Sequence, residues 1–343
     1  MSAKQKTHAA RVNALIQANP ASLQEGACIC GATAGDVIAH VDRYGFELDT
    51  VLCARCGTLR FDPYLSSEIL SRFYELHYQD LYARAVDPAI YFDHQRDYGS
   101  RVVSWLEGRA PSSPVVFEVG CGAGGALSVL SKAGCVVHGC DLSPHLIEYG
   151  LRRKVPNLCC GDLHDLSRRT GALRADLVLL HHVFEHLPAP CHWLVSAREL
   201  LAENGTVLVA VPDITRAEGY PSPDGDLRLM LHLAHKFNFT KEGLRAVAAR
   251  AGMHASLADV IPSREAPELW FAFTRLSSEE RTKEEPAVSV GGRLWRDLRG
   301  VERRYLRAAA LRKLRRLWRA VSNRRVSRAT ALPTRGGSED KEP

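Results

Sequence analysis

The sequence predicts a doubly wound α/β fold, in which helices cover both faces of a mostly parallel β-sheet. Residues 115–119 (Val-Val-Phe-Glu-Val) form a β-branched and aromatic run that is typical of a buried parallel strand. Glycines follow at positions 120, 122, 124 and 125, and a helical pattern starts at Ala126. Further strand-like runs alternate with helical patterns up to residue 212. A strand, a glycine turn and a helix in this order form the nucleotide-binding end of such a sheet.

The glycine turn fits two nucleoside-binding patterns. Gly120, Gly122 and Gly125 match G-x-G-x-x-G, and Asp141 stands about where a dinucleotide-binding fold places its ribose acid. With Glu118 in front of them, the glycines also match E-x-G-x-G-x-G. Glycine suits both patterns, because a Cβ in the turn would hold a ligand away from the backbone. The turn alone therefore leaves the cofactor open.

Four strand-like runs follow the turn, and the first three end in polar residues or glycine. They are 135–140 before Asp141, 157–160 before Gly161-Asp162-Leu163, 175–181 before His182-Val-Phe-Glu185-His186, and 207–212. In order and spacing, the turn and the first three runs resemble motifs I to IV of the class I S-adenosylmethionine-dependent methyltransferases, in their small-molecule branch. The segment 235–252 matches the late helix and glycine of this family, so the resemblance covers about residues 100–275.

The resemblance implies a Rossmann-like, seven-stranded sheet and S-adenosylmethionine as the cofactor. In the family, the acid after the second strand binds the ribose hydroxyls, and the acid of the third motif contacts the adenine amino group. The implied cofactor-binding residues are Glu118, Gly120, Cys121, Gly122, Gly124, Asp141, Leu142, Asp162, Leu163 and His181. A nicotinamide enzyme would not be expected to combine Gly161-Asp162 with Glu185-His186, so the sequence favours the sulfonium cofactor.

The implied reaction needs a nucleophile held in line with an activated methyl group, and a base when that nucleophile is a hydroxyl. Histidine suits the task because its ordinary pKa lies near neutral pH. His186, just past a strand end, is the first candidate for this base, and His235 in the late segment is the second. Glu185 and His182 complete the candidate catalytic group.

Two other interpretations of residues 182–186 stay open. Glu185 and His186 could orient the helix that follows instead of taking part in catalysis. Some quinone-pathway O-methyltransferases resemble this segment and hold a divalent cation with E-x-x-E-H, but His182 stands here in place of the first acid.

Four cysteines near the N-terminus form two pairs, Cys28-Ile-Cys30-Gly and Cys53-Ala-Arg-Cys56-Gly. Four thiolates suit a structural zinc ion, and the gap between the pairs suits a zinc ribbon, although a ribbon usually begins with C-x-x-C. Free buried cysteines are the alternative. With the helical pattern at 69–81, this stretch resembles the preface of methyltransferases from sugar and polysaccharide gene clusters, which implies a sugar or glycan-precursor acceptor.

The composition is ordinary for a globular protein, with 343 residues of which 45% are hydrophobic and 24% are charged. No apolar run approaches the roughly 20 residues of a membrane span, and the polar N-terminus lacks a signal core. A cytoplasmic protein is therefore expected, whose ten cysteines are thiols or metal ligands and not disulfides.

Basic residues gather near the C-terminus. Between residues 293 and 328 there are 14 Arg or Lys and two acids, and apolar residues recur every three or four positions. Such a helix is expected to lie on an anionic membrane surface, which would make the protein peripheral at the inner membrane surface, or to bind a protein partner. Packing on its own domain is the alternative. Nucleic acid is not favoured, since residues 180–183 (Leu-His-His-Val) replace the tetrad of base-amine methyltransferases.

The sequence therefore divides into a polar segment (1–26), a zinc-ribbon-like and helical cap (27–95), a cofactor-binding domain (96–275), a linker (276–292), the basic amphipathic helix (293–328) and a disordered tail (329–343). The expected function is O-methylation of a hydroxyl on a sugar, a glycan precursor or another small molecule, with a histidine base. C-methylation of a deoxysugar and a non-catalytic, S-adenosylmethionine-binding assembly partner stay open as alternatives.

Overall fold

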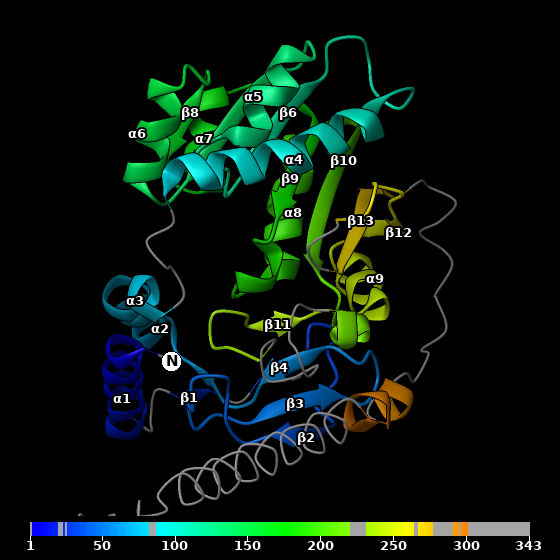
Figure 1. The fold of residues 1–343 in the computed structure, drawn as a ribbon. Helices are drawn as coiled ribbons and strands as arrows, with labels where there is room; N and C mark the ends of the chain where they lie inside the picture. The colour runs from blue at the N-terminus through cyan, green and yellow to red at the C-terminus, as the bar shows by residue number, and fades with distance from the viewer. Residues whose placement is uncertain are drawn as a thin grey trace, which may run out of the picture.

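A computed structural model describes residues 2–19, 23–24, 26–81, 87–219, 231–263, 267–276, 291–294 and 296–300. The described residues form a large unit built on a seven-stranded sheet and a smaller N-terminal unit beside it (Figure 1). Most of the predicted linker, most of the basic helix and the whole predicted tail lie outside the described residues. In the described part of the chain, no helix is both long enough and apolar enough to cross a membrane.

The large sheet has the strand order β12-β13-β10-β9-β6-β7-β8. Its strands are β6 (Val115–Val119), β7 (Val136–Asp141), β8 (Leu158–Cys160), β9 (Ala175–His181), β10 (Leu201–Pro212), β12 (Met253–Leu257) and β13 (Glu268–Arg275). The strands from β6 to β10 pair in parallel, whereas β13 runs antiparallel to both of its neighbours. The predicted seven-stranded, mostly parallel sheet is confirmed. The strand order reverses beside β6, which is where doubly wound sheets bind their ligands.

Helices cover both faces of this sheet because its central strands are apolar on both sides. In β9, Leu177 and Leu179 belong to one hydrophobic core, whereas Val178 and Leu180 belong to the other. The first core is shared with α4 (Pro88–Leu106), α5 (Gly125–Lys132) and α6 (Pro144–Arg152). The second is shared with α7 (Leu163–Thr170), α8 (Pro190–Leu200) and α9 (Lys241–Arg250).

The N-terminal unit combines short strands with helices. Its elements are α1 (Ala3–Ala18), β1 (Leu23–Gln24), β2 (Gly35–Ala39), β3 (Thr50–Cys53), β4 (Leu59–Phe61), β5 (Tyr64–Leu65), α2 (Ser67–Phe73), the π-helical turn η2 (Tyr74–Tyr78) and α3 (Gln79–Leu81). The segment expected only to be polar thus contains a helix, which Ser2 caps together with Gln5. Ala9, Val12 and Ile16 of α1 are buried in the core of the cap, so this segment is an integral part of the unit.

A short strand of the large unit completes the sheet of the small one. Strand β11 (Phe237–Asn238) pairs antiparallel with β4, which gives the sheet order β11-β4-β3-β2 (Figure 1). Thr240 Oγ1 donates a hydrogen bond to the Cys56 carbonyl oxygen at 2.5 Å. Arg250 Nη1 donates another to the Ile29 carbonyl oxygen at 2.7 Å. The two units are therefore joined through backbone groups next to the cysteine pairs.

Candidate active site

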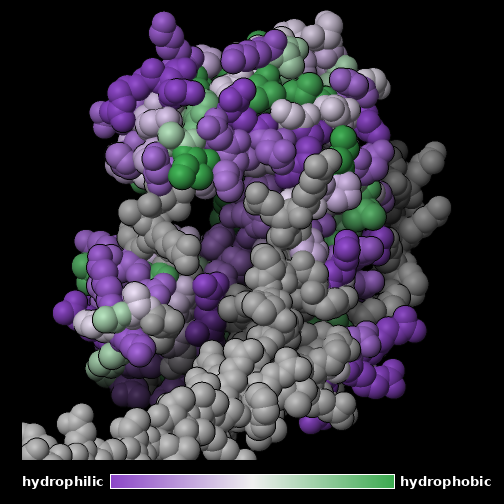
Figure 2. Space-filling view, in the orientation of Figure 1, coloured by the Kyte–Doolittle hydropathy of each residue, from purple (hydrophilic) through white to green (hydrophobic). Residues whose placement is uncertain are grey.

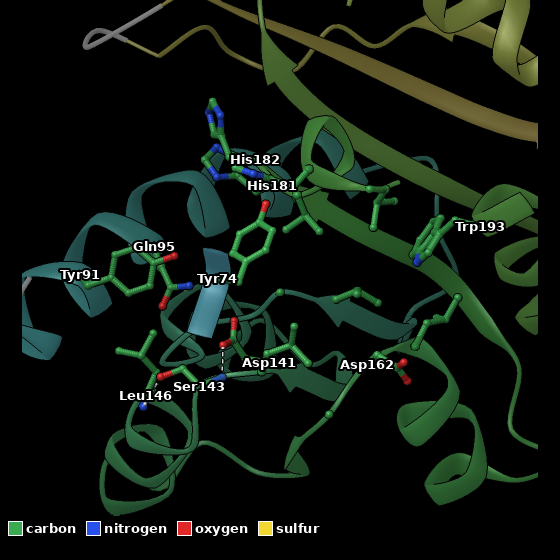
Figure 3. A pocket seen from close by; sticks show the side chains of 18 of the residues that line it. Tyr74, Tyr91, Gln95, Asp141, Ser143, Leu146, Asp162, His181, His182 and Trp193 are labelled. Carbon is green, nitrogen blue, oxygen red and sulfur yellow. Dashed lines mark hydrogen bonds between the residues drawn. The ribbon is translucent and has the colours of Figure 1, made fainter. Parts of the chain in front are cut away.

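A cavity of about 1860 Å³ lies at the carboxyl edge of the large sheet, between the sheet and the helical cap. Figure 2 shows the hollow between the two units, which hydrophilic residues largely border. The cavity is lined by the ends of β6, β7 and β9, by α4, and by Tyr74 and Tyr78 of the cap (Figure 3). Ligand pockets usually measure about 300–1,000 Å³, so this cavity has room for two molecules side by side.

The glycine turn is built for close approach of the backbone. Gly122 has a φ of +52°, and a Cβ on it would lie 2.4 Å from Tyr91 Cε1 and 2.7 Å from Gln95 Nε2. Gln95 of α4 holds the turn, since its Nε2 donates to the Cys121 carbonyl oxygen at 2.6 Å and its Oε1 accepts from the amides of Ala123 and Gly125. Gln95 could not be predicted from the sequence, because one polar residue in an amphipathic helix carries no signal of this role.

Asp141 lies where the sequence places the ribose acid. Its Oδ2 accepts a hydrogen bond from the Gly122 amide and its Oδ1 accepts one from the Ser143 amide, both at 2.8 Å (Figure 3). Burial raises the pKa of Asp141, and these two amide donors oppose that shift. Each carboxylate oxygen can accept two hydrogen bonds, so both oxygens keep an acceptor site for a ligand in the cavity. The neighbouring Leu142 is 77% exposed and offers an apolar surface to a base ring.

The remaining predicted cofactor residues divide into two groups. Gly120, Leu163, His181 and Asp162 line the cavity with Asp141 and Leu142, and Asp162 also caps α7 through its Oδ1. Glu118, Cys121, Gly122 and Gly124 are buried and support the turn from behind. These residues fit S-adenosylmethionine, because a backbone turn without Cβ atoms, a carboxylate with acceptor sites to spare and an exposed apolar side chain meet in one cavity.

Glu118 is the most deeply buried acid of the turn. Tyr98 Oη donates a hydrogen bond to Glu118 Oε1 at 2.7 Å, whereas Oε2 has no hydrogen-bond partner among the described residues. Burial raises the pKa of Glu118 to about 8, although the Tyr98 hydrogen bond lowers it.

The four predicted catalytic residues meet around one oxygen atom, Glu185 Oε1. His182 Nδ1 lies 3.3 Å from it, His235 Nε2 lies 3.8 Å from it, and His186 Nε2 lies 4.0 Å from it. Glu185 is fully buried in the 3-10 turn η3 (Phe184–His186). Burial would raise the pKa of Glu185, but the close contact with His182 and the charges of the nearby histidines lower it, although neither Glu185 oxygen has a hydrogen-bond partner among the described residues. The cluster therefore contains an ionised carboxylate.

His186 is oriented as a proton acceptor. Its Nδ1 lies 2.7 Å from the Ala234 carbonyl oxygen, and because a carbonyl oxygen only accepts, Nδ1 must carry the proton. The lone pair is then on Nε2, and His186 lines the cavity. His235 is less suitable, because it does not line the cavity and burial holds its pKa well below the ordinary value. The geometry thus favours His186 over His235.

His182 contacts a residue that the sequence analysis missed. His182 Nε2 and His181 Nε2 each lie 3.0 Å from Oε1 of Glu268, the first residue of β13. Glu268 Oε2 accepts from Arg101 Nη1 at 3.0 Å and from Trp270 Nε1 at 2.9 Å. No local pattern could reveal this contact, because Glu268 lies 86 positions after His182.

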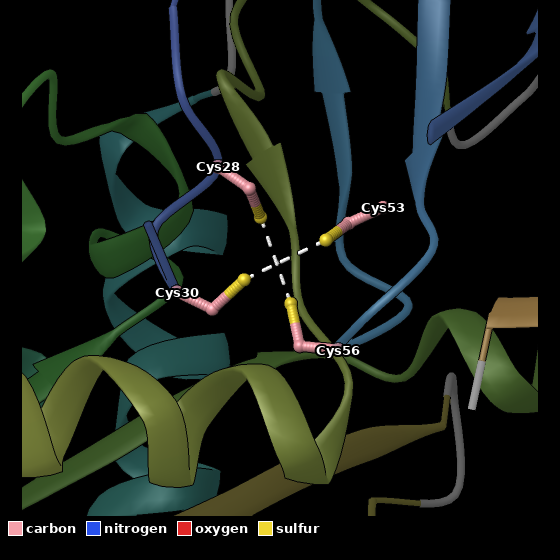
Figure 4. A group of neighbouring side chains, drawn as sticks. All are labelled: Cys28, Cys30, Cys53 and Cys56. Atoms are coloured by element: carbon pink, nitrogen blue, oxygen red, sulfur yellow. Dashed lines mark hydrogen bonds between the residues drawn. The ribbon is translucent and has the colours of Figure 1, made fainter. Parts of the chain in front are cut away.

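The four N-terminal cysteines converge (Figure 4). The Sγ atoms of Cys28 and Cys56 lie 3.5 Å apart, those of Cys30 and Cys53 lie 3.6 Å apart, and all four lie within 4.8 Å of one another. Zinc bound tetrahedrally at about 2.3 Å would place its sulfur ligands about 3.8 Å apart. The side chains are buried free thiols, so the arrangement fits the predicted zinc site.

Part of this chain is similar in sequence to known methyltransferases. A family model described as a methyltransferase domain matches residues 92–254. The ubiquinone biosynthesis O-methyltransferase of Haemophilus ducreyi is 28% identical over 103 residues, which are 28% of this chain and 44% of that protein. The enzyme of the same name from Coxiella burnetii (strain Dugway 5J108-111) is 30% identical over 95 residues, which are 26% of this chain and 40% of that protein. This chain thus spans less than half the length of these relatives.

A solved structure is also similar. The plantazolicin methyltransferase BpumL, in complex with SAH, has a TM-score of 0.45 and 14% identity over 60% of this chain and 94% of its own. The family match falls on the segment that contains the sheet, the glycine turn, Asp141 and Glu185-His186. Residues 92–254 of this chain are therefore similar to a methyltransferase domain.

Proposed function

We propose that this protein transfers a methyl group from S-adenosylmethionine to a hydroxyl of a small, uncharged acceptor, with His186 accepting the hydroxyl proton. The observation that carries this proposal is the tautomer of His186, whose Nδ1 donates to the Ala234 carbonyl oxygen at 2.7 Å. This bond leaves the Nε2 lone pair for the cavity that Asp141 and Leu142 also line.

On the side of the cavity formed by the glycine turn, Asp141 and Leu142, each residue would contact a different part of S-adenosylmethionine. When bound, S-adenosylmethionine supplies a methyl group on a positively charged sulfur. Asp141 would accept hydrogen bonds from the ribose hydroxyls with the acceptor sites that Gly122 and Ser143 leave open. Leu142 would cover one face of the base, and the turn that Gln95 fixes would let the backbone reach the ligand. Binding residues held in fixed positions increase the rate of transfer mainly by orienting the reacting groups.

The proton of the acceptor would be removed on the other side of the cavity, which His186 lines. His186 Nε2 would accept the proton of the acceptor hydroxyl while that oxygen takes the methyl group and the sulfur of the bound cofactor keeps the electron pair of the broken sulfur–methyl bond. The imidazolium that results is stabilised by the buried Glu185, whose Oε1 lies 4.0 Å from Nε2. A base positioned in this way contributes about 10²–10⁴-fold to the rate.

The charges on the cavity wall favour an acceptor without phosphate groups. Among the described lining residues, six carry carboxylates: Asp93, Asp97, Asp141, Asp162, Glu199 and Glu268. Arg101 is the one arginine or lysine of that lining, and it pairs with Asp97 at 3.3 Å and with Glu268 at 3.0 Å. Among the described lining residues, a phosphorylated acceptor would therefore find no arginine or lysine that is not already paired with a carboxylate. Neutral sugars and neutral glycan precursors remain suitable, and Tyr74 and Tyr78 offer ring faces against which such molecules pack.

The relatives named ubiquinone biosynthesis O-methyltransferase support transfer to oxygen. Simple phenols are added to the acceptors to be tested. We further propose that Cys28, Cys30, Cys53 and Cys56 hold one structural zinc ion. All ten cysteines are free thiols, which supports the expectation of a reducing compartment such as the cytoplasm.

The function is tested by incubating the protein with S-adenosylmethionine and matched acceptors, namely neutral sugars, their phosphates and simple phenols. Mass spectrometry would record the gain of one methylene per product, and calorimetry would record the binding of S-adenosylhomocysteine. We expect binding of S-adenosylhomocysteine and methylation of neutral acceptors only. Absence of binding would contradict the cofactor assignment, and preferred methylation of the phosphates would contradict the acceptor class.

A further inference from the structure

His182 lies between two buried carboxylates that come from distant parts of the chain. Its Nδ1 lies 3.3 Å from Glu185 Oε1 and its Nε2 lies 3.0 Å from Glu268 Oε1. The side chains of Glu185 and Glu268 are only 1% and 5% exposed. Both carboxylates are therefore shielded from water on the side where they face the imidazole.

The charge of His182 follows from this geometry. A neutral imidazole carries one N–H group, so it can donate to one carboxylate only, whereas an imidazolium can donate to two. A neutral ring would direct its lone pair at the second carboxylate. Burial lowers the pKa of His182, but the ion-pair contact with Glu185 and the hydrogen bond to Glu268 outweigh burial and raise this pKa to about 10.

The backbone is adapted to this contact. His182 has a φ of +54°, a left-handed conformation that is uncommon for residues other than glycine. Its amide nevertheless donates to the Ala210 carbonyl oxygen at 3.0 Å, so the turn is held at the end of the sheet. Strained residues of this kind gather at functional sites. Glu268 is fixed in its turn by Arg101 and Trp270.

We propose that His182 is a permanent imidazolium held by Glu268, and that it positions Glu185 and offsets part of its charge where Glu185 faces His186. This inference rests on the proposed function, because it assigns positioning roles around the proposed base. Glu268 and His182 are then positioning residues that act on the reaction through Glu185.

Other groups near His186 complete the electrostatic setting. The ring of His235 lies 4.9 Å from that of His186, and the ring of His232 lies 3.6 Å from that of His235. Burial holds the pKa values of both His232 and His235 well below the ordinary value, so both are neutral. Tyr74 and Lys236 line a small pocket with His186, and burial raises the pKa of Tyr74 above its ordinary value. Lys236, the lysine of this small pocket, is not substituted in any variant proposed below, so it contributes equally to all of them.

The first test reads the charge of His182 directly and needs no activity. Protein labelled with ¹⁵N in its histidine rings is examined by NMR between pH 6 and pH 9, and His182→Gln identifies the His182 signals. We expect both ring nitrogens of His182 to carry protons at pH 8.5 in the wild type. A neutral His182 at pH 8.5 would overturn the proposal, whether or not an acceptor has been found.

The second test follows methyl transfer against pH. In His182→Gln, the uncompensated charge of Glu185 favours the protonated form of His186, so the acidic limb of kcat/KM moves to higher pH. A shift of at least about 0.5 pH unit is expected for two charges at this separation. Glu268→Gln is expected to shift the limb in the opposite direction, to lower pH, and by a smaller amount, because it removes a negative charge while His182 keeps Glu185 as a partner.

Trp270→Phe provides the matched control. It removes a neutral hydrogen bond to Glu268 Oε2 but changes no charge, so the limb should stay in place even if the rate falls. Equal shifts in Trp270→Phe and Glu268→Gln would contradict the proposal and indicate a merely structural role. Absence of any methyl transfer by the wild-type protein would contradict the proposed function. The NMR experiment would still determine whether His182 is charged.

Discussion

The ring of His181 lies flat on the ring of Tyr98, with centroids 3.8 Å apart and an interplanar angle of 10°. Tyr98 belongs to α4 and donates its hydroxyl proton to Glu118 at the end of β6. His181 closes β9 and contacts Glu268 of β13. The stacked rings of Tyr98 and His181 thus connect the glycine turn with the histidine cluster, so these two residues belong to both halves of the cavity.

Glu118 gives a prediction about stability and pH. Its pKa is about 8 in the folded protein, against an ordinary value of 4.5. Between these pH values the unfolded chain releases a proton that the folded protein retains, so stability falls as pH rises, by at most about 1.4 kcal/mol per pH unit. Glu118→Gln removes this dependence and keeps an acceptor for Tyr98. The stability of the variant relative to the wild type should therefore increase from pH 5 to pH 8, as urea unfolding without ligand would measure.

Glu107→Gln, a change of the same kind at an exposed position, should show no such trend. A Glu118→Gln difference that stays constant between pH 5 and pH 8 would mean that Glu118 is already ionised in the folded protein.

His186→Gln removes the proposed proton acceptor. We expect kcat to fall about 10²–10⁴-fold, with the dissociation constant of S-adenosylhomocysteine within about threefold of the wild type, since His186 lies in the acceptor half. Steady-state kinetics and calorimetry measure the two quantities. His235→Gln is the comparison, because His235 belongs to the same cluster but does not line the cavity, and its loss should be clearly smaller. Full activity in His186→Gln would rule out the assigned base.

Asp141→Asn should weaken cofactor binding. Hydrogen bonds to charged groups contribute about 1.5–3 kcal/mol, so a loss of about 10- to 100-fold in affinity is expected, with kcat at saturating cofactor little changed. Asp176→Asn is the control, because Asp176 accepts a hydrogen bond from the Val115 amide at the opposite end of β6. That variant should lose stability and keep its affinity. Equal affinities in the two variants would remove Asp141 from the cofactor site.

The cysteine cluster predicts one equivalent of zinc per chain. Cys56→Ser should lose the metal and lower the melting temperature, because α9 packs in the same core as the cluster. Cys160→Ser, which alters an exposed thiol outside the cluster, should retain both. Elemental analysis and thermal unfolding measure these outcomes, and metal-free wild-type protein prepared under reducing conditions would refute the site. If the wild type bound a second equivalent of metal and Glu185→Gln lost it, His186 would lie beside a metal ion. That result would contradict the proposal that His186 acts as the base without a metal.

Much of the cofactor half could be predicted from the sequence, because its groups are fixed by local structure. Parallel strands end at one edge of the sheet, so Asp141 and Asp162 had to lie near the glycine turn once the strands were recognised. Glu185 and His186 follow from the same reasoning at the end of β9. In each case the sequence shows a short, strongly apolar run that is followed by a glycine or an acidic residue.

The supports of the site could not be predicted in this way. Gln95 and Glu268 act through contacts 26 and 86 positions away along the chain, and each is one polar residue without a pattern around it. The buried face of α1 was missed for a different reason, because Ala9, Val12 and Ile16 are too few and too small to form an evident apolar stripe. Tertiary packing, and not local preference, decides these positions.

The pairing of β11 with β4 also determines when the small unit can finish folding. During synthesis from the N-terminus, β4 is made early but waits for Phe237 and Asn238, by which time most of the cofactor-binding domain has emerged. A separately expressed fragment ending at residue 81 would keep an open strand edge that invites intermolecular pairing. Evolution could therefore exchange this cap between enzymes only together with the segment that closes it.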